Sequence, residues 1–328
     1  MHSTSTQTID SNAAPSLSRT VSRSLSLALL LALSGFLALS ATAQQLDAPD
    51  TNQSFPVGPS PWGLASDGAN IWVTSLDSNN VTKLRASDGT LLGTFPAGGR
   101  TFFAAFDGIN IWVTNPANNT VTRLRASDGT LQGIFPAGTE PGGILFDGTN
   151  IWVADYHNTV TKLQASDGTL LGTFSVTGNP LELAFDGSNI WVTDLNAGSV
   201  TRLRASDGAF RGSVAVGAVP YGILFDGANI WVTSGGDDTV TKLRVSDGAL
   251  LGTFAVGTTP RELAFDGVHL WVSNNGSNTV MELARTNGAV QHTYAVESSP
   301  AGILFDGTSI WVANYLSNTV DKITRTQP

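Results

Sequence analysis

A tryptophan that returns at nearly constant spacing is the feature that most constrains how this chain folds. One copy stands in the run Phe146–Val153, which reads Phe-Asp-Gly-Thr-Asn-Ile-Trp-Val. Successive copies are 40, 40, 39, 40, 40 and 40 residues apart. A period of this size indicates a repeat protein in which each unit is one supersecondary block. The seven tryptophans are Trp72, Trp112, Trp152, Trp191, Trp231, Trp271 and Trp311.

Each unit contains four short apolar runs. In the third unit these runs cover residues 143–146, 150–154, 160–163 and 170–174. Asp-Gly separates the first run from the second, and Ser-Asp-Gly separates the third from the fourth. Asp-Gly between β-prone runs predicts a tight hairpin with a type I′ turn. Four antiparallel strands in each unit are typical of a propeller blade.

The two ends of the repeat region complement each other. The Phe, Pro and Gly of residues 53–61 fall in register with those of residues 93–101, at the end of a unit, whereas the seventh unit stops before its last strand. An open stack would leave exposed sheet edges, and closing the ring removes them. We therefore predict an all-β, seven-bladed β-propeller over residues 53–328, with four antiparallel strands per blade and the N-terminal strand closing the last blade. The blades should begin near Pro61, Thr101, Pro141, Pro180, Pro220, Pro260 and Pro300, with each first strand lining the central channel.

Residues 1–43 have the pattern of a signal peptide, and residues 44–52 form a polar linker. Arg19 and Arg23 precede the apolar run Leu25–Leu39, which has 15 residues, and Ala41–Ala43 gives a small-x-small cleavage pattern. A membrane span needs about 20 apolar residues, so this run suits a signal better than a span. We expect a bacterial protein exported to the periplasm or the medium, without a membrane span in the mature chain. An uncleaved anchor is the alternative.

Composition excludes several classes of site. The chain has no cysteine, which excludes disulfides, thiolate metal sites and thiol nucleophiles. The formal net charge is −9, whereas a nucleic-acid binder normally carries a basic surface. We therefore expect no nucleic-acid partner.

The unit resembles the YVTN family of bacterial β-propeller repeats. The resemblance lies in Ile111–Asn115 (Ile-Trp-Val-Thr-Asn), Asn119–Val121, Asp128–Thr130 and Gly138, with Trp in place of the family's usual Tyr. The Trp-Val-Thr form is also similar to the repeats of streptogramin (virginiamycin B) lyases, which are seven-bladed and use His and Glu with Mg²⁺. The resemblance implies a propeller, a fold that serves binding modules, surface proteins and some enzymes. No matching catalytic constellation is present, so no residue is carried over.

One face of the propeller should carry the function. Loops between blades and loops between second and third strands share that face and vary in sequence, whereas the other face has the uniform Asp-Gly turns. Residues of these loops, together with Ser75, Asn115, Asn274 and their equivalents after Trp-Val, should rim the channel mouth; capping of local turns is the alternative role. The predicted ligand-binding residues are Trp62, Phe102, Asp155, Tyr156, Glu182, Asp194, Tyr221, Arg261 and Glu262.

The remaining charged residues give less indication of a functional site. Glu182 and Glu262 share one blade position across the channel, and a metal between Asp155 and Asp194 is a further hypothesis. The sequence places the three blade histidines too far apart to converge, which argues against a metallo-lyase. A cation recurs at one position of the third strands. We interpret this row of side chains as a solvated outer rail, in which Glu282 once replaces the cation. The histidines are His157, His269 and His292, and the cations are Lys83, Arg123, Lys162, Arg202 and Lys242.

These patterns favour an exported, monomeric binding module that recognises a protein, peptide or glycan through its loop-rich face. No catalytic residue, metal ligand or cofactor is assigned. The alternative is a metal-dependent lyase or lactone hydrolase, with Glu182, Glu262 or Asp155 as metal ligand or base and Mg²⁺ or Ca²⁺ as cofactor.

Overall fold

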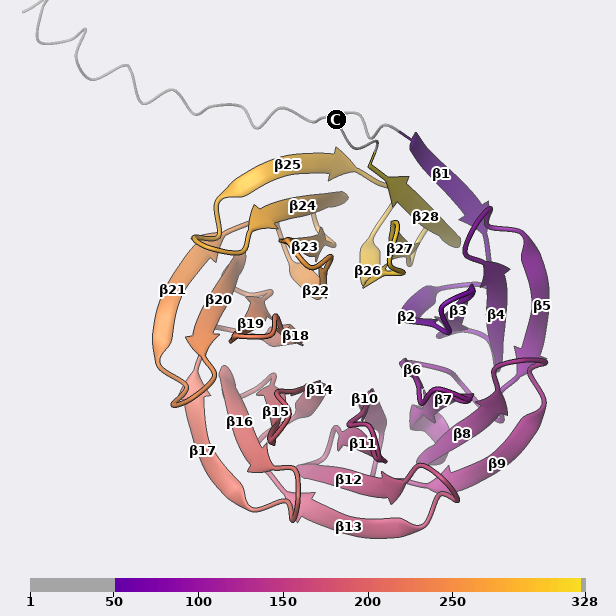
Figure 1. The fold of residues 1–328 in the computed structure, drawn as a ribbon, viewed down its shortest axis with the longest axis horizontal. Helices are drawn as coiled ribbons and strands as arrows, with labels where there is room; N and C mark the ends of the chain where they lie inside the picture. Colours follow the sequence, from indigo (N-terminus) through magenta and orange to yellow (C-terminus); the bar gives the residue numbers. More distant parts are fainter. Residues whose placement is uncertain (1–50, 326–328) are drawn as a thin grey trace, which may run out of the picture. The chain divides into compact units, whose positions relative to one another are not determined.

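The computed structural model describes residues 51–325, which form seven four-stranded antiparallel sheets arranged as blades around a channel (Figure 1). None of these residues belongs to a helix long and apolar enough to cross a membrane. The sheets have no helical layer, and one 3₁₀ turn, η1 (Pro116–Asn118), follows β7. The predicted signal peptide and most of the predicted linker lie outside the described residues. The end of the predicted linker, residues 51–52, belongs to β1.

The strands of blades one to four follow one another along the chain. Blade one contains β2 (Pro61–Ser66), β3 (Asn70–Ser75), β4 (Asn80–Arg85) and β5 (Leu91–Pro96); blade two contains β6 (Ala104–Phe106), β7 (Asn110–Asn115), β8 (Thr120–Arg125) and β9 (Leu131–Pro136); blade three contains β10 (Pro141–Phe146), β11 (Asn150–Asp155), β12 (Thr159–Gln164) and β13 (Leu170–Ser175); blade four contains β14 (Pro180–Phe185), β15 (Asn189–Asp194), β16 (Ser199–Arg204) and β17 (Phe210–Ala215).

Blades five and six repeat this order, and blade seven joins the two ends of the described chain. Blade five contains β18 (Pro220–Phe225), β19 (Asn229–Ser234), β20 (Thr239–Arg244) and β21 (Leu250–Ala255); blade six contains β22 (Pro260–Phe265), β23 (His269–Asn274), β24 (Thr279–Ala284) and β25 (Val290–Ala295); blade seven contains β26 (Pro300–Phe305), β27 (Ile310–Asn314), β28 (Thr319–Thr324) and β1 (Thr51–Pro56).

Strand β1 closes the ring, as predicted. It pairs antiparallel with β28, and Phe55 lies opposite Val320. Phe55 also contacts Trp311 at a ring-centroid distance of 5.7 Å, and an equivalent aromatic pair occurs in each of the other blades except blade four, where Val214 takes the place of the second ring. The first strands line the channel and the fourth strands form the outer wall (Figure 1). One predicted start is displaced, since β6 begins at Ala104 and not at Thr101.

The seven repeat tryptophans form the core between blades. Each is less than 2% exposed. Trp72, for example, lies 5.5 Å from Phe95 of its own blade and packs in one cluster with Ile111 and Val113 of blade two. Because every tryptophan joins two blades in this way, the burial term that stabilises one blade also holds its neighbour.

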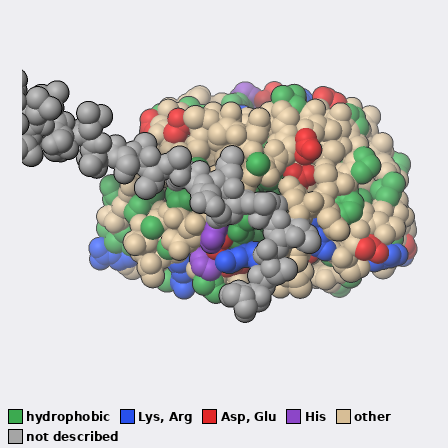
Figure 2. Space-filling model, turned by 90° about the horizontal axis from the view of Figure 1, so that it is seen from above, with side chains coloured by type: hydrophobic (Ala, Val, Ile, Leu, Met, Phe, Trp, Pro, Cys, Tyr) green, Lys and Arg blue, Asp and Glu red, His purple; other side chains and the backbone are tan. Residues whose placement is uncertain are grey.

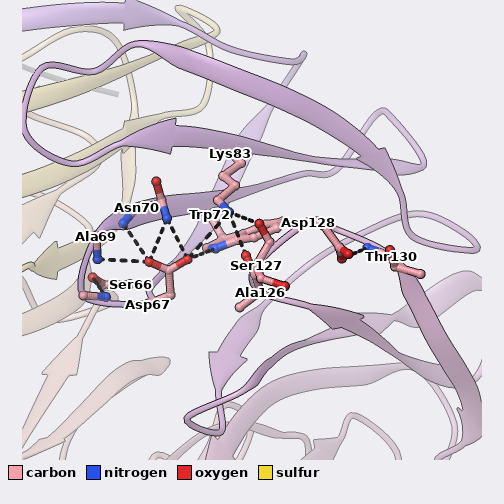
Figure 3. Close-up of polar contacts among 11 residues, drawn as sticks. Ser66, Asp67, Ala69, Asn70, Trp72, Lys83, Ala126, Ser127, Asp128 and Thr130 are labelled. Atoms are coloured by element: carbon pink, nitrogen blue, oxygen red, sulfur yellow. Dashed lines mark hydrogen bonds and ion pairs between the residues drawn. The ribbon is translucent and has the colours of Figure 1, made fainter.

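The first Asp-Gly turn of each blade holds the tryptophan, and Figure 3 shows this turn in blade one. Asp67 Oδ1 accepts hydrogen bonds from the backbone N–H groups of Ala69 and Asn70, and Oδ2 accepts one from Trp72 Nε1 at 2.9 Å. Burial alone would raise the pKa of Asp67, but these hydrogen bonds outweigh it and hold the pKa below its ordinary value. A type I′ turn needs positive φ at both central residues. Among the residues of this turn only Gly68 has positive φ, at +89°, so the turn is not the predicted type I′. The carboxylate–indole bond recurs at 2.7–2.9 Å in all seven blades, from Asp67, Asp107, Asp147, Asp186, Asp226, Asp266 and Asp306.

The predicted solvated rail of cations is wrong. Lys83 is 6% exposed, lies 4.8 Å above the Trp72 ring, and donates to the carbonyls of Ala126 and Ser127 in the next blade. A lysine stem reaches that far because it packs along the indole and keeps its ammonium at the blade edge. The row is therefore a set of clamps between blades, made by Lys83, Arg123, Lys162, Arg202, Lys242 and Lys322.

The junction between blades six and seven reverses this polarity. Glu282 replaces the cation, is fully buried, and pairs with Arg325 Nη1 at 2.9 Å and with His269 Nδ1 at 3.1 Å. Tyr294 donates its hydroxyl to Glu282 Oε2 at 3.2 Å, and His292 lies opposite Glu282 in the strand register. The prediction that the histidines cannot converge is thus wrong for this pair, which flanks one carboxylate.

The turns between third and fourth strands carry exposed ion pairs. Arg85 pairs with Asp88 at 3.0 Å, and Arg125 pairs with Asp128 at 3.1 Å. Figure 2 shows Lys and Arg side chains along one edge of the view, with acidic side chains beside several of them. These turns lie on the face of the Asp-Gly hairpins, so the opposite face is left to the variable loops.

Candidate functional site

Two consecutive residues bulge into the channel mouth in six of the seven first strands. In β2, Pro61 pairs with Ser75 and Leu64 pairs with Val73, so Trp62 and Gly63 together lie opposite the single residue Thr74. A β-bulge redirects side chains, and bulges concentrate near functional sites. The equivalent pairs are residues 142–143, 181–182, 221–222, 261–262 and 301–302, so five predicted site residues lie in these bulges.

A buried hydroxyl positions most of these bulges. Thr74 Oγ1 accepts a hydrogen bond from Gly63 N at 2.8 Å and donates one to Phe102 O of the next blade at 2.5 Å. Thr233 makes the same pair of bonds, accepting from Gly222 N and donating to Arg261 O. Sequence reasoning missed this role, although a hydroxyl stands two residues after the tryptophan in Thr74, Thr114, Thr193, Thr233 and Ser273.

Three predicted residues meet at the mouth. The guanidinium carbon of Arg261 lies 3.9 Å from the Tyr221 ring centroid and 5.5 Å from the Trp62 ring centroid. Ala301 occupies the bulge between Arg261 and Trp62 in ring order, and a larger side chain there would separate the two. We call Trp62, Tyr221 and Arg261 the mouth cluster. Cation–π contacts hold the guanidinium in this place.

Glu182 and Glu262 lie in the bulges of β14 and β22, and Glu262 directly follows Arg261 of the mouth cluster. A Cβ on Gly143 would come within 2.7 Å of Glu182 Oε2, and one on Gly222 within 2.9 Å of Glu262 Oε2. These glycines give the carboxylates room. Burial and then the charge of Glu262 raise the pKa of Glu182, and burial raises the pKa of Glu262 to about 8, although Arg261 opposes that shift. The pair therefore keeps a proton at neutral pH, so one member can act as an acid.

A groove of about 350 Å³ adjoins the mouth cluster on the variable face. It crosses blades one to three, and predicted residues Trp62, Phe102 and Tyr156 provide its aromatic walls. Trp62 and Phe102 contact each other at 5.3 Å between ring centroids. Because Trp62 belongs to both groups, the groove and the mouth cluster are continuous. The lining consists of Trp62, Leu76, Arg100, Phe102, Pro116, Ala117, Glu140, Pro141, Gly142 and Tyr156.

Two charged groups stand at the groove. Arg100 Nε donates to Leu76 O at 2.9 Å, which fixes the side chain across the inter-blade loop. Glu140 Oε2 lies 3.4 Å from His157 Nε2 at an exposed position. The groove thus combines three aromatic rings with a cation and an anion.

Asp155 and Asp194 do not reach this face. They are 0% and 1% exposed, and the equivalent Ser75, Asn115, Ser234, Asn274 and Asn314 are equally buried, so the predicted polar rim is wrong. Asp155 accepts hydrogen bonds from Gly138 N, Thr159 and Thr161, and burial raises its pKa to about 6 in spite of these bonds. Asp194 accepts from backbone N–H groups of the adjoining loops. Their surroundings suit the capping role that was the alternative.

The described residues do not assemble a metal site by side-chain type. Between residues 51 and 325, no group of three or more His, Asp or Glu side chains is placed to hold a metal ion. Glu182 and Glu262 lack a third such partner.

Comparisons with known proteins identify the fold. No family model matches the chain, so the YVTN label stays a resemblance, and no curated protein matches it. A solved structure described as streptogramin B lyase is similar over 83% of this chain and 96% of its own, with 20% identity and a TM-score of 0.72. A Kuenenia stuttgartiensis hydrazine synthase structure is similar over 88% of this chain and 99% of its own, with 17% identity and a TM-score of 0.73. At these identities the likeness establishes the β-propeller fold and nothing about activity.

Proposed function

We propose that this propeller is an exported binding module that captures a peptide in the groove beside the channel mouth. The observation that carries the proposal is the continuity of the groove with the mouth cluster through Trp62. Aromatic walls on a rigid scaffold provide apolar contact area at low entropic cost, and a few polar groups orient the ligand.

A peptide suits the lining better than a glycan. Sugar hydroxyls need many hydrogen-bond partners, yet none of the ten lining residues is Asn, Asp, Gln, Ser or Thr. Prolines 116 and 141 and the three aromatic rings instead offer the kind of surface that takes extended, apolar peptide segments. Arg100 and Glu140 would then select charged side chains along the segment.

The test is capture of random hexapeptide pools on immobilised protein, followed by mass spectrometry of the retained peptides. Tyr156→Ala and Phe102→Ala should each reduce capture several-fold, because truncating an aromatic anchor commonly costs about 1–2 kcal/mol or more. Phe210→Ala is the matched control, since Phe210 is 63% exposed on β17 in the outer wall. If both groove variants retain the wild-type peptides at wild-type levels, the groove is not the site.

A lyase or hydrolase is the second candidate, favoured by the Glu182–Glu262 pair. Two carboxylates with raised pKa values, one of which is raised in part by the charge of the other, can divide the roles of general acid and general base. Turnover of a lactone or cyclic peptide that Glu262→Gln abolishes would establish this function. Loss of that turnover on EDTA treatment, with Mg²⁺ or Ca²⁺ retained through dialysis, would identify its metal-dependent form.

A further inference from the structure

Arg261 is an unusual arginine because its guanidinium makes no hydrogen bond to any residue between 51 and 325, and no ion pair there includes it. Its Nε is buried without a partner, and so is the neighbouring Trp62 Nε1. Each buried donor left unpaired costs about 1–3 kcal/mol, so native proteins keep few of them. Two unpaired donors at one mouth point to an acceptor that comes from a ligand.

Stacking gives this guanidinium a fixed plane. Tyr221 and Trp62 contact it from blades five and one, and Thr233 donates to the carbonyl of Arg261 at 2.6 Å. The terminal nitrogens of Arg261 are not among the buried unpartnered atoms, so they keep access to solvent. An arginine held in this way presents a rigid pair of N–H donors, which matches the two oxygens of a carboxylate.

The charge at the mouth permits an anion. Two ionised glutamates would repel it, but the raised pKa values of Glu182 and Glu262 keep a proton on the pair at neutral pH. Arg261 then offsets the remaining charge. The mouth carries no net negative charge from these three groups.

The surroundings indicate where a peptide would end. Phe103 and Leu181 are buried in one apolar cluster, and Trp62 and Tyr221 pack against that cluster. These contacts hold the two rings in place beside Arg261. Trp62 lines the groove and its ring centroid lies 5.5 Å from the guanidinium carbon of Arg261, so a peptide whose side chains occupy the groove can reach the guanidinium with the carboxylate at its end.

We propose that Arg261 binds the C-terminal carboxylate of a peptide whose preceding side chains lie in the groove. This inference rests on the proposed function and specifies its ligand. It makes Arg261 the specificity-determining residue, while Trp62 and Tyr221 position its guanidinium.

The experiment compares two random hexapeptide pools of identical composition, one with free C-terminal acids and one with C-terminal amides, over wild-type protein. Acids should bind about tenfold to a hundredfold more tightly, because a hydrogen bond to a charged group is worth more than a neutral one. Arg261→Gln should remove this preference. Arg261→Lys should keep part of it, since it retains the charge without the two-pronged geometry. Arg211→Gln removes an exposed outer-wall arginine and should change nothing.

Each outcome separates the two proposals. Capture of acids and amides in equal amounts, or a preference that survives in Arg261→Gln, overturns the role of Arg261 and leaves peptide binding standing. Selection of internal Asp or Glu regardless of the C-terminus overturns the assignment to a chain end. Failure of wild-type protein to capture either pool overturns both. Thermal melts of every variant show which losses come from misfolding, and Arg261→Lys serves if Arg261→Gln does not fold.

Discussion

The two faces of this propeller treat the same residue types in opposite ways. On the hairpin face each of the seven repeat indoles has a partner, as when Trp72 Nε1 donates to Asp67. At the mouth, Trp62 Nε1 and Arg261 Nε have none. Asp67, which bonds an indole on the hairpin face, has a lowered pKa, whereas the pKa values of Glu182 and Glu262 are raised. The repeated groups hold the blades together, whereas the mouth contains groups whose hydrogen-bonding capacity is unused.

A similar contrast separates two kinds of cation–π contact. Lys83 lies over Trp72 and also donates to two backbone carbonyls, so its charge is fully used within the fold. Arg261 lies over Tyr221 and Trp62 and donates to no described residue. The first arrangement is a clamp between blades, while the second leaves hydrogen-bonding capacity unused.

The strongest test of this contrast compares two tryptophans. Trp152→Ala should lower the free energy of unfolding by about 3–5 kcal/mol, because it leaves a cavity between two blades. Trp62→Ala should cost only about 1–2 kcal/mol, since Trp62 is half-buried and loses contacts mainly with Phe102 and Tyr315. Urea unfolding of both variants measures the difference. Equal losses would mean that Trp62 is a core residue and that the mouth is not set apart from the fold.

The second test uses pH. Glutamate in the unfolded chain titrates near 4.5, whereas the folded pKa of Glu262 is about 8, so the folded protein binds more protons between these values. Stability should therefore fall as pH rises through that window. Glu262→Gln removes the cost of ionising this group where burial opposes its charge, and it should stabilise the protein at pH 8 by on the order of 2 kcal/mol. The same pH slope in both proteins would contradict a protonated pair.

Much of the architecture follows from the sequence because its signals repeat. The period of the tryptophans predicted seven blades, and the match between residues 53–61 and a unit's end predicted the closure by β1. The cation row was misread because a strand pattern shows which side Lys83 takes but not how far its stem reaches. The only sign in the sequence that these side chains make pairs was Glu282, the one acidic residue at a position where the other blades have a cation.

Only part of the candidate site could be predicted from the sequence, for a related reason. Trp62, Tyr221 and Arg261 were predicted because they vary at a fixed blade position, although the bulge that brings consecutive residues to the mouth has no sequence signature. Asp155 and Tyr156 are neighbours, yet one is buried under the loop and the other lines the groove. The alternation of buried and exposed side chains along a strand stops at its end, so it cannot predict which of two such neighbours is buried.

The smallest expected effect lies on the hairpin face and has the opposite sign with pH. Burial opposes ionisation of Asp147, but hydrogen bonds from Trp152, Asn150 and Thr149 hold its pKa below the ordinary value. Asp147→Asn places an amide donor against one of these N–H groups and should cost about 1–2 kcal/mol at pH 7. Since this stabilisation is present above pH 4 and lost as pH falls below it, the two proteins should converge in acid. Asp167→Asn, in an exposed turn of the same blade that bonds no indole, is the control and should lose less at pH 7. A wild-type advantage that persists undiminished at pH 2 would mean that the carboxylate charge does not hold the tryptophan, and the contrast between the two faces would then rest on packing alone.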